Sequence, residues 1–196
     1  GLAMVDDVLR VLDALGIEAA HLAGYSMGAE IALSTAARHP GRVLSVVAAG
    51  SGWSGPAEAE SYARIGRLMG ASRDFTEAVR QMRPGMDPKG VEAMLRLLAA
   101  HGIEDSDQDM AALAACAGGM AEVVTLSGAD IAGIGVPVLG LAGERDGERA
   151  RIEAMAGVVP DFRMEVLEGR DHLDAVTDPA FAAAVTGFLR EVALDR

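Results

Sequence analysis

The chain has 196 residues, of which 51% are hydrophobic and 4% aromatic, and it carries a net charge of −12 at pH 7. This length fits one domain, and the apolar content is enough for a core. The acidic balance argues against a nucleic-acid partner, because no basic patch is present to neutralise phosphates.

The single cysteine, Cys116, provides neither an internal disulfide framework nor a cysteine metal cluster. No apolar run reaches the roughly 18 residues that a membrane span needs, and no secretory leader opens the chain. We therefore expect a cytoplasmic protein that needs no metal or other cofactor and has no membrane partner. The composition leaves its oligomeric state open.

The first fifty residues alternate helix and strand patterns. Apolar residues recur at helical spacing from 4 to 15, and Gly16 is placed to end that helix. A buried strand is predicted at 19–25 and a helix at 29–38. The uninterrupted apolar run at 43–49 is typical of a strand that is covered on both faces.

The character changes between residues 53 and 130, where no convincing strand pattern occurs. Helical stripes are separated by turn formers such as Pro84-Gly85. We predict a helical insertion here, with helices at 57–69, 75–82, 91–100 and 109–124.

Alternation resumes in the last third of the chain. Strands are predicted at 136–142 and 163–167, and helices at 149–158 and 181–192. Strands that alternate with helices indicate an α/β fold whose mostly parallel sheet has helices on both faces. The core then comprises residues 1–52 and 131–196, and functional sites are expected at the carboxyl ends of its strands.

One such end carries the pentapeptide Gly24-Tyr25-Ser26-Met27-Gly28, a G-x-S-x-G turn between a strand and a helix. A turn of this kind strains the serine backbone and exposes its hydroxyl. We expect Gly24 and Gly28 to be glycines because a β-carbon would not fit where strand and helix approach.

A nucleophilic serine needs a base and a carboxylate that orients the base, and in this strand-turn-helix context they follow in the order Ser, Asp or Glu, His. Asp146 and His172 follow Ser26 in that order, each directly after a predicted strand. The other three histidines fit less well, since they lie within a strand (His21), at a helix end (His39) or in the insertion (His101).

Four further carboxylates are rivals for the orienting role. Glu144 and Glu148 flank Asp146, while Asp171 and Asp174 flank His172. A neighbour of the histidine would have to fold back to reach its Nδ1 atom. Asp146 is therefore the preferred candidate.

These residues resemble the α/β-hydrolase fold family. The resemblance extends over nearly the whole chain and is carried by G-Y-S-M-G, by V-P-V-L-G-L-A-G-E-R-D, and by G-R-D-H followed by D-P and a final helix. It implies Ser26 as nucleophile, Asp146 as acid, His172 as base and the Met27 N–H as an oxyanion-hole donor. It also implies that residues 53–130 form a cap that selects the substrate.

The predicted function is hydrolysis of a small ester, lactone or thioester through an acyl-enzyme, with a small acyl compound as the partner. Alternatives on the same fold are an acyltransferase, a carbon–carbon bond hydrolase or a lyase. A third is a non-catalytic binding module, or an inactive fragment of a hydrolase. Tyr25 and Trp53 are predicted to bind substrate. Apolar candidates for an acyl pocket in the insertion are Met69, Met82, Met86, Met94, Leu97 and Leu98.

The chain departs from the family pattern at its start. Members have several strands before the nucleophile and a loop that supplies a second oxyanion donor, whereas this sequence begins on the helix before the nucleophile strand. We expect a fragment of a longer chain. Expressed alone, these residues are expected to self-associate through an unpaired strand edge and to show little esterase activity.

Overall fold

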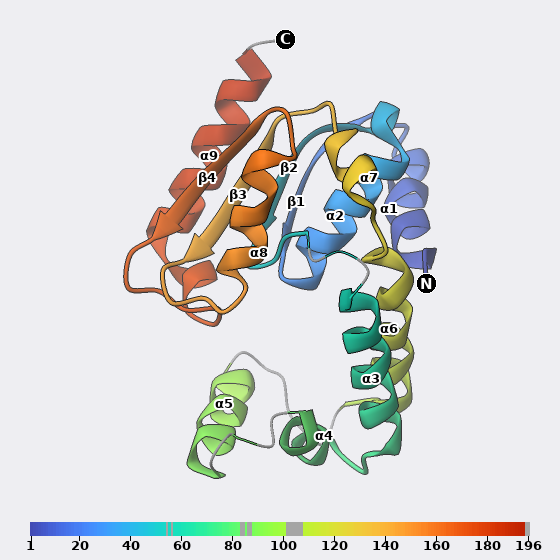
Figure 1. The fold of residues 1–196 in the computed structure, drawn as a ribbon, viewed down its shortest axis with the longest axis vertical. Coiled ribbons are helices and arrows are strands. Elements are labelled where there is room, and N and C mark those ends of the chain that lie inside the picture. The colour runs from blue at the N-terminus through green and yellow to red at the C-terminus, as the bar shows by residue number, and fades with distance from the viewer. Residues whose placement is uncertain (54, 56, 83–84, 86–87, 101–107, 195–196) are drawn as a thin grey trace. The chain divides into compact units, whose positions relative to one another are not determined.

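A computed structural model describes the chain except for residues 54, 56, 83–84, 86–87, 101–107 and 195–196 (Figure 1). It contains two compact units. One comprises Leu2–Pro56 and Val123–Arg196, and the other comprises Gly1 and Ala57–Glu122. The first unit holds all four strands of the described residues.

The four strands form one parallel sheet in the order β1-β2-β3-β4. Their bounds are β1 Ala20–Tyr25, β2 Val43–Ala49, β3 Val138–Gly143 and β4 Phe162–Leu167. The α/β class and the parallel sheet predicted from the sequence are thereby confirmed. Since all strands run the same way, the residues that follow β1, β3 and β4 gather at one edge of the sheet.

Helices cover both faces of this sheet. The helices of this unit are α1 (Ala3–Ala14), α2 (Met27–Arg38), α7 (Gly128–Ala132), α8 (Arg149–Glu153) and α9 (Pro179–Leu194). Figure 1 shows α2 and α8 in front of the strands and α9 behind them. The helix predicted at 149–158 is shorter than expected, because α8 gives way to a 3-10 helix at Ala154–Gly157.

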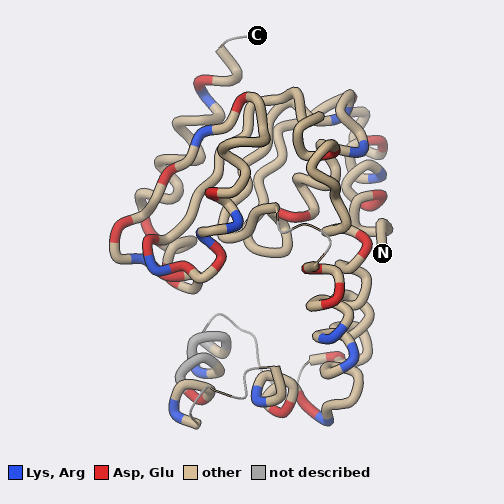
Figure 2. The backbone as a smooth tube through the Cα atoms, viewed as in Figure 1, with Lys and Arg blue, Asp and Glu red and all other residues tan. Residues whose placement is uncertain are grey.

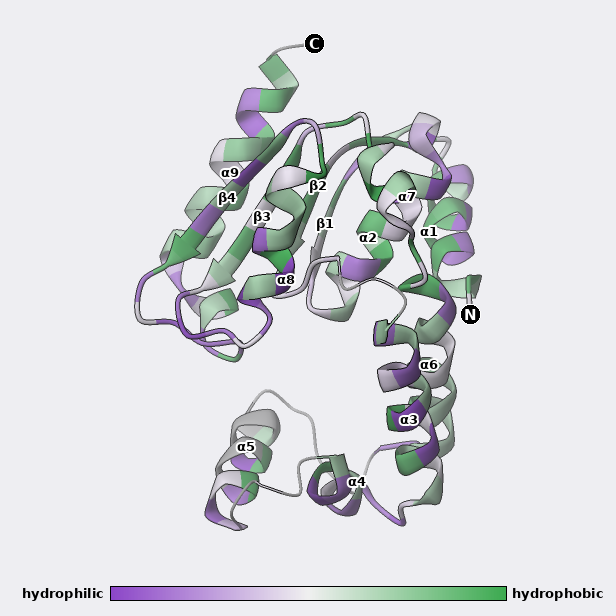
Figure 3. Cartoon of the chain, viewed as in Figure 1, coloured by the Kyte–Doolittle hydropathy of each residue, from purple (hydrophilic) through white to green (hydrophobic). Residues whose placement is uncertain are grey.

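Alternating side chains of β2 divide the interior into two cores. Val46 and Ala48 belong to the core beneath α2 and α8, while Val47 and Ala49 belong to the core beneath α9. Figure 3 shows the hydrophobic colouring of β2 and β3 between these helices. The apolar run at 43–49 forms the whole of β2, since a strand covered on both faces needs apolar residues at successive positions.

The second unit consists of helices and their connections, with no strand among its described residues. It contains α3 (Ala57–Ala71), α4 (Phe75–Met82), α5 (Pro88–Ala100) and most of α6 (Met110–Val123). Helices α3 and α6 approach closely at Gly66, where an added β-carbon would lie 2.8 Å from the Gly118 nitrogen. Its role as a cap stays a prediction.

The candidate acyl-pocket residues lie in this helical unit. Met69 and Met82 are partly buried in it. Met86 and the side chains of Met94, Leu97 and Leu98 lie outside the described part of the structure.

Candidate active site

Ser26 sits in a strained turn between β1 and α2. Its φ of 54° and ψ of −119° make it the one non-glycine residue with positive φ in the described part of the chain. The Ser26 N–H donates to the Ala49 carbonyl at 2.7 Å, so the turn is attached to the end of β2. Non-glycine residues persist in such conformations only where the surrounding structure enforces them, and they concentrate at functional sites.

The two glycines of the motif have different reasons to be there. A β-carbon on Gly24 would lie 2.1 Å from the Gly28 carbonyl oxygen, so the expectation for Gly24 agrees with the structure. The expectation for Gly28 was wrong, because a β-carbon there would meet no atom within 4 Å. The helix backbone at Gly28 approaches the strand, and only the strand residue must lack a side chain.

The structure brings Ser26, His172 and Asp146 into one hydrogen-bonded chain. His172 Nε2 lies 3.1 Å from Ser26 Oγ, and His172 Nδ1 lies 3.1 Å and 3.2 Å from the two carboxylate oxygens of Asp146. The side chain of Asp146 is fully buried, while that of His172 is one-third exposed. A histidine that is accessible to solvent and has a buried carboxylate behind it can accept a proton from the serine hydroxyl.

The loops that carry the acid and the base are attached to each other by backbone hydrogen bonds. The Arg145 N–H donates to the Arg170 carbonyl at 2.8 Å, and the Glu144 N–H donates to the Leu167 carbonyl at 2.9 Å. A β-carbon on Gly143 would lie 2.4 Å from the Arg170 oxygen, so β3 ends where the two loops touch. This pairing holds the start of the loop that carries His172 against the loop that carries Asp146.

The rival carboxylates make other contacts. Asp171 accepts hydrogen bonds from the Leu173 and Asp174 N–H groups, which hold the pKa of its carboxyl below the usual range. Glu144 accepts from the Gly169 N–H at 2.8 Å, and Glu148 pairs with Arg151. Figure 2 shows that charged residues gather on the loops after β3 and β4, yet the carboxylate at His172 Nδ1 is that of Asp146.

The other predicted site residues contact the protein in different ways. Met27 begins α2 directly after the serine, with its side chain exposed. The Tyr25 hydroxyl donates to the His172 carbonyl at 2.7 Å. Of the alternative histidines, His21 pairs with Ser45 through Nδ1 at 2.8 Å, and His101 lies outside the described residues.

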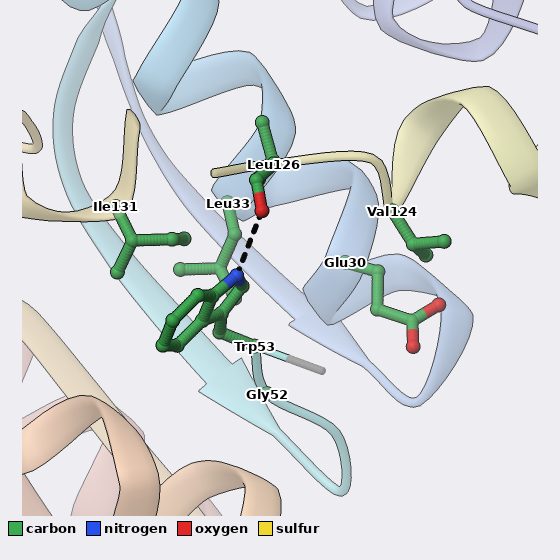
Figure 4. A pocket seen from close by; sticks show the side chains of 7 residues that line it. All are labelled: Glu30, Leu33, Gly52, Trp53, Val124, Leu126 and Ile131. Atoms are coloured by element: carbon green, nitrogen blue, oxygen red, sulfur yellow. Dashed lines mark hydrogen bonds between the residues drawn. The ribbon is translucent and has the colours of Figure 1, made fainter. Parts of the chain in front are cut away.

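Trp53 packs into the interior of the first unit. Its indole Nε1 donates to the Leu126 carbonyl at 2.9 Å, and Figure 4 shows the ring beside Leu33 and Ile131. The cavity next to it measures about 10 Å³, which is room for one water molecule at most. The predicted roles of Trp53 and Tyr25 in substrate binding stay predictions.

Sequence reasoning did not find a buried carboxylate behind the serine turn. Glu30, one turn into α2, is 4% exposed and accepts a hydrogen bond at 2.9 Å from the Ser51 hydroxyl. This pair joins α2 to the loop after β2. A glutamate in the first turn of a helix usually faces solvent, so the sequence carried no signal of its burial.

The described residues contain no group of three or more His, Cys, Asp or Glu side chains that is arranged to hold a metal ion. Among the helices that the structure describes, none has the length and apolar character to cross a membrane.

Comparisons with known proteins place the chain in a family. Residues 2–99, half of the chain, match the family model of the alpha/beta hydrolase fold. A hydrolase from Pseudomonas aeruginosa PA01 has a similar structure, with a TM-score of 0.76 and 27% identity over 94% of this chain. A thermophilic esterase from Thermogutta terrifontis shares the fold, with a TM-score of 0.74 and 24% identity over 97% of this chain.

The match is partial along the length of these proteins. It covers 70% of the Pseudomonas chain and 72% of the Thermogutta chain. A protein of Caulobacter sp. (strain K31), named as a candidate carbamate hydrolase RutD, is 43% identical over 54 residues, which are 28% of this chain and 20% of that protein. This chain belongs to the alpha/beta hydrolase fold family.

Proposed function

We propose that this chain carries the nucleophile, base and acid of a serine hydrolase that cleaves a small, fairly apolar ester, lactone or thioester. The observation that carries the proposal is the hydrogen-bonded chain from Asp146 through His172 to the strained Ser26. Membership of a family of hydrolases supports it. The substrate class is our inference from this chemistry.

In the proposed reaction, Ser26 Oγ attacks the acyl carbonyl while His172 Nε2 accepts its proton. Asp146 accepts a hydrogen bond from Nδ1–H, which selects the tautomer with a free lone pair on Nε2 and stabilises the imidazolium that forms. The proton then passes to the leaving alcohol or thiol. Water, activated by the same imidazole, releases the acid from the acyl-enzyme.

Negative charge on the carbonyl oxygen develops beside the start of α2. The helix begins at Met27, directly after the nucleophile, and its N-terminal end carries partial positive charge. We assign the Met27 N–H to the stabilisation of this oxyanion.

Labelling with a fluorophosphonate tests the nucleophile. We expect one covalent adduct on the peptide that contains Ser26, located by mass spectrometry, and loss of the adduct in Ser26→Ala. Ser34→Ala is a matched control, since Ser34 is fully buried in the middle of α2. An adduct at another residue, or none on the native chain, would contradict the proposal.

A carbamate is a second substrate class with a specific observation behind it. The Caulobacter protein with 43% identity over 54 residues carries that name. Aryl esters and aryl carbamates with the same leaving group allow a direct comparison of the two acyl classes. Release of the leaving group with added alcohol or thiol acceptors separates hydrolysis from acyl transfer.

A further inference from the structure

Tyr25 precedes the serine in the motif, and its side chain is enclosed by three other segments. Its ring lies 5.4 Å from the His172 imidazole, centre to centre, and 5.7 Å from the Phe181 ring in an edge-on contact. Gly50, after β2, has a φ of 64°, and a β-carbon there would lie 2.8 Å from the Tyr25 ring. The ring is thus held between the ends of β1 and β2, the histidine loop and α9.

The hydroxyl of this tyrosine makes a specific bond at the edge of the site. It donates to the main-chain carbonyl of His172 at 2.7 Å. Burial, together with the negative charges of Asp146 and two further aspartates, raises the pKa of Tyr25 to about 12. The hydroxyl therefore keeps its proton throughout the neutral range and remains a donor.

His172 needs such a hold because it lies on an irregular loop. The residues between β4 and the 3-10 helix at Ala175–Thr177 form turns, and no strand or helix fixes the histidine backbone. The ring bonds Asp146 through Nδ1 and Ser26 through Nε2. A shift of the main chain behind the ring would change the distance from Nε2 to Ser26 Oγ.

We propose that Tyr25 is a positioning residue that anchors the main chain of His172, so that Nε2 stays within reach of Ser26 Oγ. This inference rests on the proposed function, in which that contact transfers a proton. It assigns Tyr25 a role through the protein's own histidine, distinct from the substrate-binding role that the motif suggested. Because the anchor is independent of the substrate, its loss affects every acyl donor equally.

Tyr25→Phe tests the anchor, because it removes the hydroxyl and keeps the ring that packs on Gly50. The measurements are the inactivation rate constant and the binding constant of two alkyl fluorophosphonates, one short and one long. We expect the rate constant to fall about fivefold to tenfold, which corresponds to the loss of one hydrogen bond. The binding constants stay unchanged, and the factor is the same for both probes.

Ser45→Ala is the control, since it also removes one side-chain hydroxyl from the sheet, and that buried hydroxyl bonds His21, which lies outside the candidate site. It should leave the rate constant unchanged. A Tyr25→Phe effect on the binding constant, or one that depends on the alkyl length, would make Tyr25 a substrate-binding residue and overturn the proposal. An unchanged rate constant would overturn it as well.

Hydrogen exchange separates this inference from the proposed function. In Tyr25→Phe without probe, amides of residues 168–174 should exchange faster, while those of β3 keep the native rate. If the native chain takes no label at Ser26, the proposed function fails, and the exchange data still decide whether Tyr25 holds the loop. Unchanged exchange at 168–174 would contradict the anchor.

Discussion

Strands β1 and β3 each lead into one end of the candidate site, yet they are held in different ways. Every residue of β3 is buried, and the strand pairs with β2 on one side and β4 on the other. No residue of β1 is fully buried, and among the described residues only β2 pairs with it. The acid thus follows a strand enclosed by protein, while the nucleophile follows a strand that is paired on one side among the described residues.

The difference shows that the position of the serine turn depends on contacts made at the turn itself. Ser26 is fixed by the close approach of Gly24 to the start of α2 and by its bond to Ala49. Asp146 is fixed by a strand with neighbours on both sides and by the loop paired with it. Substitutions near β3 should therefore act through the whole sheet, and those near β1 through the turn.

The largest effect is expected at the acid that follows β3. Asp146→Asn should slow phosphonate labelling of Ser26 by up to about 10⁴-fold, because the amide favours the wrong imidazole tautomer. Asp171→Asn is the control and should change the rate by less than about threefold, since its partners are backbone N–H groups. A crippling effect of Asp171→Asn would give the orienting role to that carboxylate.

Core truncations compare the two strands directly. Leu139→Ala in β3 should lower the free energy of unfolding by about 2–5 kcal/mol, because that side chain is 1% exposed. Leu22→Ala in β1 should cost less, because Leu22 is only partly buried. Urea unfolding measures both. Equal losses would mean that β1 is as enclosed in solution as β3.

Substitutions of the two motif glycines test how the turn after β1 is held. Gly24→Ala should destabilise the chain by about 1–3 kcal/mol, because the methyl group would overlap the backbone of Gly28. Gly28→Ala has open space around the new methyl group, and within a helix alanine is favoured over glycine by up to about 1 kcal/mol. Thermal unfolding measures the stability of both variants. A larger loss of stability for Gly28→Ala would refute this interpretation of the turn.

The smallest expected effect concerns association at the β1 side. The outer edge of β1 has no strand partner among the described residues, and α1, which precedes β1 in the chain, exposes Val11 at 57% and its C-cap residue Leu15 at 66%. We expect the chain to self-associate at micromolar concentration, and Val11→Lys with Leu15→Lys to reduce the larger species. Size-exclusion chromatography with light scattering measures this. A monodisperse native monomer would contradict it.

The sequence predicted the strands of the sheet well, and also the order of the strand ends that carry the three candidate residues. Apolar runs such as 43–49 and 136–142 produce strands wherever they are covered on both faces, so their pattern is local and readable. It did not predict α7, whose start is a capping box between Ser127 and Asp130. A five-residue helix is too short to leave a periodic pattern, and only the side-chain hydrogen bonds at its first turn mark it.

Other features depended on contacts between distant segments. The roles of Gly28 and Glu30 were not readable, because each depends on which backbone or side chain arrives opposite it. The same holds for Tyr25, whose partner His172 lies 147 residues along the chain. Residue type alone does not state what a side chain will touch.

The sequence by itself determined the alternating elements, the strained turn at Ser26 and the order of the three candidate residues, since these follow from local pattern and backbone sterics. Only the tertiary structure decided that Asp146 is the carboxylate that reaches His172, and that the Tyr25 hydroxyl bonds the His172 carbonyl while its ring contacts Phe181 of α9. Strand order and register set distances between residues that are far apart in sequence, and a hydrogen bond tolerates only a few tenths of an ångström of error.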